Sequence, residues 1–147
     1  MKLSVIILTT VLSFFAATTN AADGKVSPAV LNSFNSSFEK ATEVKWTATT
    51  EYYKADFSYN GMYVSAFYDA AGTMIALTRN ISPVQLPVRL QSSTKKHYAG
   101  YWVSDLFELS NENGTTYYMT LENADNVIVV KAAGSDDWAV YQKQSKS

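Results

Sequence analysis

The sequence predicts an α+β domain in which two helices lie on one face of a single antiparallel sheet of about seven to eight strands. Three observations support this fold class. A helix pattern precedes a run of short strands twice, turn residues separate the strands, and Phe57 and Phe107 stand at similar places 50 residues apart. Self-similarity at a fixed spacing is typical of repeated architecture. We therefore expect two repeats, over residues 26–82 and 83–143, within one domain over residues 22–147.

The N-terminus has the pattern of a secretory signal peptide. Lys2 supplies a positive start, an apolar and hydroxyl stretch without charge follows over residues 3–17, and small residues surround Ala21. This arrangement predicts a signal peptide over residues 1–21. A membrane anchor is the alternative, but the apolar core is shorter than the roughly 20 residues that span a bilayer. We therefore expect a periplasmic or secreted protein with no integral membrane segment after cleavage.

The first predicted helix covers residues 27–41. Ser27 is a good N-cap, and Pro28 fits the first turn, where its missing N–H leaves no hydrogen bond unmade. Apolar side chains then recur every three or four residues and form one stripe, made up of Val30 or Leu31, Phe34, Phe38 and Ala41. That stripe needs a sheet to cover it.

Strands in the first half are predicted from alternation and turns. Over residues 53–59, aromatic and apolar side chains alternate with polar ones, so one face of the strand is dry and the other is wet. The Asn-Gly dipeptide at residues 60–61 is a strong hairpin signal because both residues tolerate positive φ. The partner strand over residues 62–68 leads through a glycine turn into an apolar run over residues 73–77.

The second half has the same order of elements. A more polar helix is predicted over residues 87–98, and an Asn-Gly turn again lies between two alternating strands. The expected strands cover residues 106–109, 115–121, 127–130 and 138–141.

Charge and composition argue against several classes of protein. Without Lys2 the chain carries 11 Lys and Arg against 13 Asp and Glu, a formal net charge of −2. Nucleic-acid binding depends on Lys and Arg that neutralise phosphates, so we expect no nucleic-acid partner. The chain contains no Cys, so we expect neither a disulfide framework nor a lipoprotein anchor.

No residue pattern indicates an active site, a cofactor or a metal site. His97 is the only His and stands beside two Lys, where exposure to solvent is the simplest interpretation. A zinc site would need a carboxylate-rich set, which has no recognisable spacing here. Asp125 and the pair at residues 136–137 could offer oxygen ligands to calcium, but turn chemistry explains the same residues. We therefore assign no catalytic residue, no cofactor and no metal ligand.

Aromatic side chains are the most distinctive feature of the chain. Tyr, Phe and Trp make up 14% of the sequence and lie largely in the predicted strands. Tyr63, Phe67 and Tyr118 fall by alternation on the face away from the helices, where exposed rings would mark an interface. Tyr52 could extend that patch, so these four are the candidate partner-binding residues. For four other rings we expect ordinary core filling and cross-strand pairing, namely Phe57, Tyr68, Phe107 and Tyr117.

Seven short motifs along the chain together indicate a family. They are Phe38 with Ala41, Val44-Lys45-Trp46, Tyr53-x-Ala55-x-Phe57, Asn60-Gly61, Ala66-x-Tyr68, Asp69-x-x-Gly72 and Leu86-Pro87. With these motifs the chain, from about Val26 to Lys143, resembles the PepSY-like, β-lactamase-inhibitor-like domains of Gram-negative envelope proteins. This resemblance implies a tandem repeat whose helices back one continuous antiparallel sheet, with the opposite face and its loops free to bind. The family name implies inhibition of a secreted enzyme, but no inhibitory motif can be matched residue by residue.

Three functions from different classes remain open. The leading hypothesis is a secreted, non-catalytic binding module, such as an inhibitor of a peptidase or another enzyme, that uses the open sheet face and the hairpin loops. The second is a structural or accessory envelope protein that self-associates, with residues 127–130 as a candidate unpaired edge. The third is a hydrolase, which would need a convergent pocket with carboxylates such as Asp105, Glu108 or Glu122.

Overall fold

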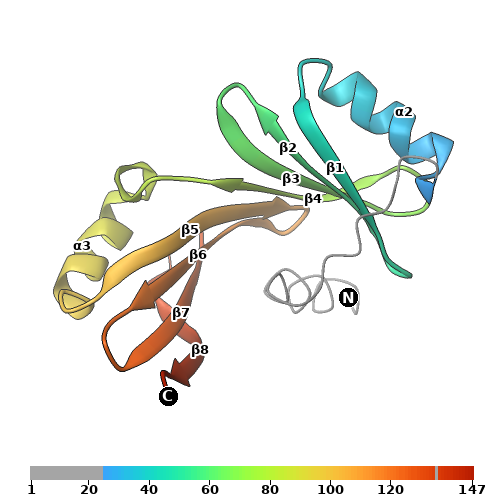
Figure 1. Ribbon diagram of the computed structural model, residues 1–147. Coiled ribbons are helices and arrows are strands. Elements are labelled where there is room, and N and C mark those ends of the chain that lie inside the picture. The colour runs from blue at the N-terminus through green and yellow to red at the C-terminus, as the bar shows by residue number, and fades with distance from the viewer. Residues whose placement is uncertain (1–24, 135) are drawn as a thin grey trace.

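Two sets of elements in the same order build one sheet (Figure 1). The N-terminal half contains the helix α2 (Pro28–Ser37) and the strands β1 (Thr42–Ala48), β2 (Tyr53–Tyr59), β3 (Met62–Tyr68) and β4 (Met74–Asn80). The C-terminal half contains the 3-10 helix η3 (Pro83–Gln85), the helix α3 (Val88–His97) and the strands β5 (Trp102–Asn111), β6 (Gly114–Glu122), β7 (Asn126–Ala133) and β8 (Ala139–Ser145).

The computed structural model describes residues 25–134 and 136–147. Within these ranges the strands form a single eight-stranded antiparallel sheet, and they follow one another across it in sequence order from β1 to β8. The predicted α+β class with one antiparallel sheet is therefore confirmed. The expected signal peptide, residues 1–21, lies outside the described residues. No helix of the described part is long and apolar enough to cross a membrane.

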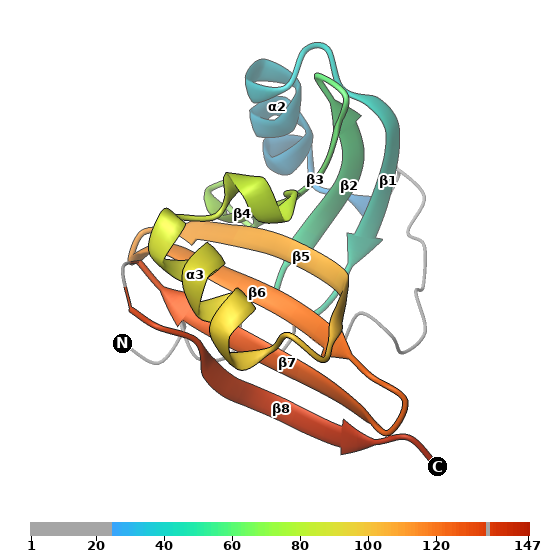
Figure 2. The same cartoon turned by 90° about the vertical axis from the view of Figure 1, so that its left-hand side faces the viewer.

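Both helices pack on the same face of the twisted sheet (Figure 2). Strand register explains this, because Ala66 pairs with Leu77 and Leu106 with Met119, which keeps the core side chains of both halves on one side. Under α2 the buried residues are Val26, Val30, Phe34, Trp46, Ala55, Phe57, Val64, Ala66 and Tyr68. Under α3 they are Ile81, Leu86, Leu90, Leu106, Met119, Leu121, Ile128, Val130 and Ala132.

The helix α2 begins where the sequence predicts and ends earlier. The Ser27 hydroxyl accepts a hydrogen bond of 3.4 Å from the Val30 N–H, as an N-cap does. Phe38 leaves the helical conformation, so the helix ends at Ser37 rather than near residue 41. Asn35 and the two serines after it are weak helix formers, which favours this early end. Phe38 still packs against the core from its position just past the helix.

Strand β1 was not predicted from alternation. Its register against β2 shifts between Thr42 and Lys45, and Glu43 has a φ of 55° there. A bulge of this kind inserts a residue and interrupts the period-two pattern. Trp46 nevertheless points under α2 and is buried.

Two turns depend on their residue types. Asn60 and Gly61 have φ values of 51° and 76°, which confirms the predicted hairpin between β2 and β3. Gly72, between β3 and β4, has a φ of 86°, and a Cβ there would lie 2.6 Å from the carbonyl oxygen of Ala29 in α2. Glycine therefore allows this turn to press against the helix backbone.

Two expectations about the C-terminal strands are wrong. Residues 127–130 are not an unpaired edge, because they lie in β7 between β6 and β8. The edge strands of the sheet are β1 and β8. Trp138 is not part of a strand either, since β8 begins at Ala139. The sequence predicted a last strand over residues 138–141 but not its partner, and the polar sequence of residues 142–145 concealed the length of β8.

Candidate functional site

The sheet face away from the helices carries a hollow of about 860 Å³. Strand pairing creates it, because Ser65 lies opposite Thr78 and Val129 lies opposite Gln142 on this face. Most of the lining side chains are uncharged hydrogen-bonding groups. The lining residues are Tyr63, Ser65, Thr78, Asn80, Ser104, Asp105, Phe107, Thr120, Glu122, Val127, Val129, Gln142 and Gln144.

Asp105 is one of the two charged residues of this lining. Asp105 lies opposite Thr120 and shares the open face with Phe107, two residues further along β5, and the register of β5 against β6 shifts just before it. The Asn80 side-chain amide donates a hydrogen bond of 3.0 Å to Asp105 Oδ1. Partial burial raises the pKa of Asp105, and hydrogen bonds from the Leu106 backbone and Asn80 oppose that rise.

Glu122 is the second charged residue of the lining, and it has a basic partner. Lys146 Nζ lies 2.8 Å from Glu122 Oε2 and also 4.8 Å from the centre of the Trp102 ring. Hydrogen bonds from Lys146 and Ser104 lower the pKa of Glu122. Glu122 is therefore a neutralised acid at one side of the hollow.

An apolar cluster lies on the same face beside the hollow. Tyr118 stacks on Phe107 with ring centres 5.2 Å apart, and its ring edge meets Tyr141 at 5.8 Å. Burial raises the pKa of the Tyr118 hydroxyl, which has no hydrogen-bond partner in the described structure. The buried members of the cluster are Phe67, Ala76, Leu109, Tyr118 and Val129.

A charged group connects strands β2 and β3 on this face. Lys54 Nζ lies 2.9 Å from Asp56 Oδ2, and the Ser65 hydroxyl donates to Asp56 Oδ1. Burial lowers the pKa of Lys54, while its hydrogen bond to Asp56 acts in the opposite direction. The positive charge of Lys54 is thus compensated within the N-terminal half.

The four predicted binding residues lie on the face away from the helices, but they differ in exposure. Tyr63 is 56% exposed and lines the hollow, as expected. Phe67 and Tyr118 are each only 1% exposed, so the expectation that they present rings to solvent is wrong. Tyr52 packs edge-on against Phe67 with ring centres 5.5 Å apart. Tyr52 therefore adds to the apolar cluster around Phe67 and Tyr118 and does not extend an exposed patch. Alternation correctly assigns the face of a side chain, but burial depends on neighbouring strands.

The three candidate catalytic carboxylates do not converge. Asp105 and Glu122 line the hollow, whereas Glu108 lies on the helix-bearing face and pairs with Arg79. Of the three alternatives, Asp105 and Glu122 therefore share one hollow, and Glu108 makes no contribution to it. Sequence reasoning also missed Asn80, Gln142 and Gln144 as lining residues. For the two glutamines the sequence did offer a signal, because residues two apart in a strand point to the same face of the sheet.

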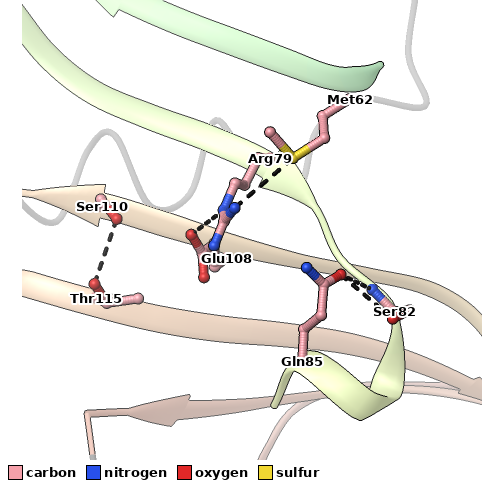
Figure 3. A network of polar contacts seen from close by, with 7 residues as sticks. All are labelled: Met62, Arg79, Ser82, Gln85, Glu108, Ser110 and Thr115. Carbon is pink, nitrogen blue, oxygen red and sulfur yellow. Dashed lines mark hydrogen bonds and ion pairs between the residues drawn. The ribbon is translucent and has the colours of Figure 1, made fainter. Parts of the chain in front are cut away.

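The Arg79–Glu108 ion pair connects β4 of the N-terminal half to β5 of the C-terminal half, on the helix-bearing face of the sheet (Figure 3). Arg79 in β4 donates to Glu108 in β5 and also reaches the sulfur of Met62 at 3.7 Å. Ser110 and Thr115 share a hydrogen bond of 3.3 Å nearby. The pair is partly exposed, so its contribution to stability is expected to be small. Its position indicates a structural role.

The loop residues that could offer oxygen ligands to calcium take part in hydrogen bonds within the chain. Asn123 Oδ1 accepts hydrogen bonds from the backbone N–H groups of Asp125 and Asn126. Asp137 accepts a hydrogen bond from the Ser93 hydroxyl of α3. The described residues hold no group of three or more His, Cys, Asp or Glu that could bind a metal ion. His97 is exposed in the last turn of α3.

Comparison with known proteins identifies relatives in fold. No protein-family model matches the chain, and no curated protein matches it. A BLIP-like protein from Bacteroides fragilis is similar in structure with a TM-score of 0.67 at 20% identity, covering 81% of this chain and 85% of that one. A DUF2874 family protein from Bacteroides uniformis has a TM-score of 0.70 at 14% identity, covering 81% and 88%. A candidate periplasmic protein from Bacteroides eggerthii has a TM-score of 0.73 at 12% identity, covering 83% and 90%. The chain therefore has the fold of BLIP-like and DUF2874 proteins.

Proposed function

We propose that this chain is a secreted, non-catalytic module that binds a protein partner through the hollow on its open sheet face. The hollow itself carries this proposal. Its volume of about 860 Å³ leaves room for side chains of a partner, and its floor is a β-sheet. Its lining includes the exposed ring of Tyr63, and tyrosine is enriched at protein interfaces and at their hot spots. Many uncharged groups beside it can form hydrogen bonds with a partner.

The fold relatives support one class of partner. BLIP-like proteins share this fold, which supports an inhibitor-like role against a secreted or periplasmic enzyme. The relative described as a candidate periplasmic protein supports a periplasmic or secreted location in a Gram-negative envelope, as for PepSY-like domains. The repeated order of a helix and four strands supports an origin of the two halves as tandem repeats.

Site-specific photo-crosslinking tests the proposed binding face. The photoreactive residue p-benzoyl-phenylalanine replaces Tyr63 in the hollow or Val88 on the outside of α3, which is 77% exposed. Each protein is then irradiated in a periplasmic extract of its own host. We expect a discrete adduct from position 63 and none from position 88. Adducts from position 88 alone, or from neither position, would contradict the proposed site.

A rate assay tests the inhibitory part of the proposal. The crosslinked partner is purified, or a panel of β-lactamases and secreted peptidases is used, and hydrolysis is followed with increasing amounts of the chain. We expect the parent protein to reduce the rate of one enzyme, and Tyr63→Ala to weaken that inhibition about tenfold, as for an exposed aromatic hot spot. A Val88→Ser variant serves as the control and should inhibit like the parent.

Self-association is the second candidate, and an exposed edge favours it. Strand β8 pairs only with β7, and Val140 on it is 58% exposed. Unpaired edges can add a strand from another chain. Lys143 and Lys146 on and after this strand act against such pairing. Sedimentation velocity over a hundredfold concentration range, with Val140→Lys beside the parent, distinguishes this candidate from the first.

A further inference from the structure

The hollow contains one acid without a basic partner. Of its two charged residues, Glu122 pairs with Lys146, whereas Asp105 receives hydrogen bonds from neutral donors, the Asn80 amide and the Leu106 backbone. Within the described residues, no Lys or Arg forms an ion pair with Asp105. The hollow therefore presents net negative charge to whatever enters it.

Three other basic side chains on this face do not line the hollow. Lys54 pairs with Asp56 at 2.9 Å, and Lys131 lies 4.9 Å above the ring of Tyr141. Lys45 is exposed on the edge strand β1, opposite Asp56 in β2. Among the described residues, Asp105 therefore has no cation as its neighbour in the hollow, and a partner can supply one.

The surroundings of Asp105 favour such a cation. The carboxylate is half-buried, and a charge pair is stronger where water is partly excluded than in bulk solvent. Burial raises the pKa of Asp105, because its carboxylate loses water that would otherwise stabilise the negative charge. Tyr63 and Phe107 also line the hollow, and the faces of aromatic rings attract cations.

We propose that the hollow receives a Lys or Arg side chain of the protein partner, with Asp105 as its counter-ion and Tyr63 and Phe107 as its aromatic neighbours. This inference rests on the proposed function and narrows it to partners that display a basic side chain. Charge complementarity selects this occupant, because an acidic segment would be repelled and an apolar one would leave Asp105 without a partner.

A titration with small peptides tests the inference without the natural partner. The probes are acetyl-Gly-Lys-Gly-amide and two analogues of similar size, with norleucine or Glu in place of Lys. Binding to the 15N-labelled secreted form of the protein is followed through the amide shifts of Thr120 and Gln142, which line the hollow. We expect the lysine peptide to bind at least about fivefold more tightly than the norleucine peptide, and the Glu peptide to be the weakest.

A matched pair of variants assigns the effect to Asp105. Asp105→Asn keeps a side-chain oxygen for the Asn80 hydrogen bond and should remove the preference for lysine over norleucine. Glu112→Gln removes one negative charge at the exposed β5–β6 turn and should keep the preference. If Asp105→Asn does not fold, the lysine preference is followed over a series of pH values in the parent and in Glu122→Gln, which lacks the other acid of the hollow, and it should fall in both proteins as Asp105 becomes protonated.

Two outcomes would overturn the inference. Equal binding of the lysine and norleucine peptides would show that the hollow does not select a positive charge. A preference for lysine that persists in Asp105→Asn would show that Asp105 is not its counter-ion. Either result would leave the proposed function standing, because crosslinking from Tyr63 does not depend on the charge of the partner. An absence of crosslinking from Tyr63 would instead contradict the proposed function itself.

Discussion

The two halves of the sheet carry the same order of elements over cores of different chemistry. Under α2 the core is aromatic, with Phe34 in edge-on contact with Trp46 at 5.1 Å and with Phe57 at 5.0 Å between ring centres. Under α3 the buried residues are aliphatic side chains and Met119. One architecture therefore tolerates two ways to fill its interior, provided that each strand keeps its apolar side chains on the helix-bearing face.

The two helices also differ in how they are held. The helix α2 buries Val30 and Phe34, whereas α3 buries only one apolar side chain, Leu90, together with Ser93. Polar contacts from the loop before β8 compensate for this difference. The Trp138 indole N–H donates to the Leu90 carbonyl at 3.2 Å and to the Thr94 hydroxyl at 2.9 Å. A polar helix can thus be fixed by a loop more than 40 residues away along the chain.

The largest effect is expected from truncation in the aromatic core. Phe57 is fully buried and lies 5.0 Å from Phe34 and 4.7 Å from Phe38 between ring centres. Phe57→Ala should lower the free energy of unfolding by about 4 kcal/mol, because it leaves a cavity between α2 and the sheet. Urea denaturation measures the change. A loss below about 1.5 kcal/mol would mean that the ring cluster repacks easily and is not a tight core.

A smaller but more local effect is expected from the corresponding change under α3. Leu90→Ala removes the only buried apolar side chain of this helix and should lower the free energy of unfolding by about 3 kcal/mol. Hydrogen exchange should show that amides of α3 lose protection before those of α2. Equal loss in both helices would indicate that the two halves unfold as one unit.

The loop contact to α3 should have an intermediate effect. Trp138→Phe keeps most of the ring but removes the indole N–H, and we expect a loss of about 1 kcal/mol in the free energy of unfolding. The protection of α3 amides should fall while that of α2 amides is unchanged. Ser27→Ala, which removes the N-cap of α2, is the matched control and should act on α2 alone. If Trp138→Phe affects both helices equally, the loop does not hold α3 specifically.

The smallest expected effect is a pH dependence of stability that arises at α3, in the C-terminal half, and has no counterpart at α2. The Ser93 hydroxyl, then the Trp138 N–H, and the charges of Arg89 and His97 lower the pKa of Asp137 below its ordinary 3.8. Because the pKa of Asp137 is lower in the folded state than in the unfolded state, its ionised carboxylate stabilises the fold at pH values above the unfolded-state pKa. This contribution is lost as the pH falls through the folded-state pKa. The stability difference between the parent and Asp137→Asn should therefore narrow below about pH 3.8. Urea denaturation of the parent and of Asp137→Asn side by side, from about pH 2.5 to 6, measures this difference over roughly the range in which Asp side chains titrate. A constant difference over this range would show that Asp137 does not secure α3 through its charge.

Much of the N-terminal half was predictable from local patterns. Ser27 with Pro28 marked the start of α2, and Asn60-Gly61 marked the hairpin, because caps and tight turns depend on residues close together in sequence. Alternation also gave the correct face for Tyr63, since successive side chains in a strand point to opposite faces. The bulge at Glu43 concealed β1 because it breaks that alternation.

The hollow needed the tertiary structure. Asp105 lines it because β5 pairs with β6, where Asp105 lies opposite Thr120, and Gln142 and Gln144 line it because β8 adds to β7. Pairing between strands determines which side chains meet, and it depends on contacts between residues far apart in the chain. The sequence by itself therefore determined the fold class, the main turns and the face of most side chains, through local conformational preferences. Only the assembled sheet decided that Phe67 and Tyr118 are buried, that Glu108 lies on the other face, and that Asp105 has no basic partner in the described structure, because burial and pairing of charges are set by neighbours from distant strands.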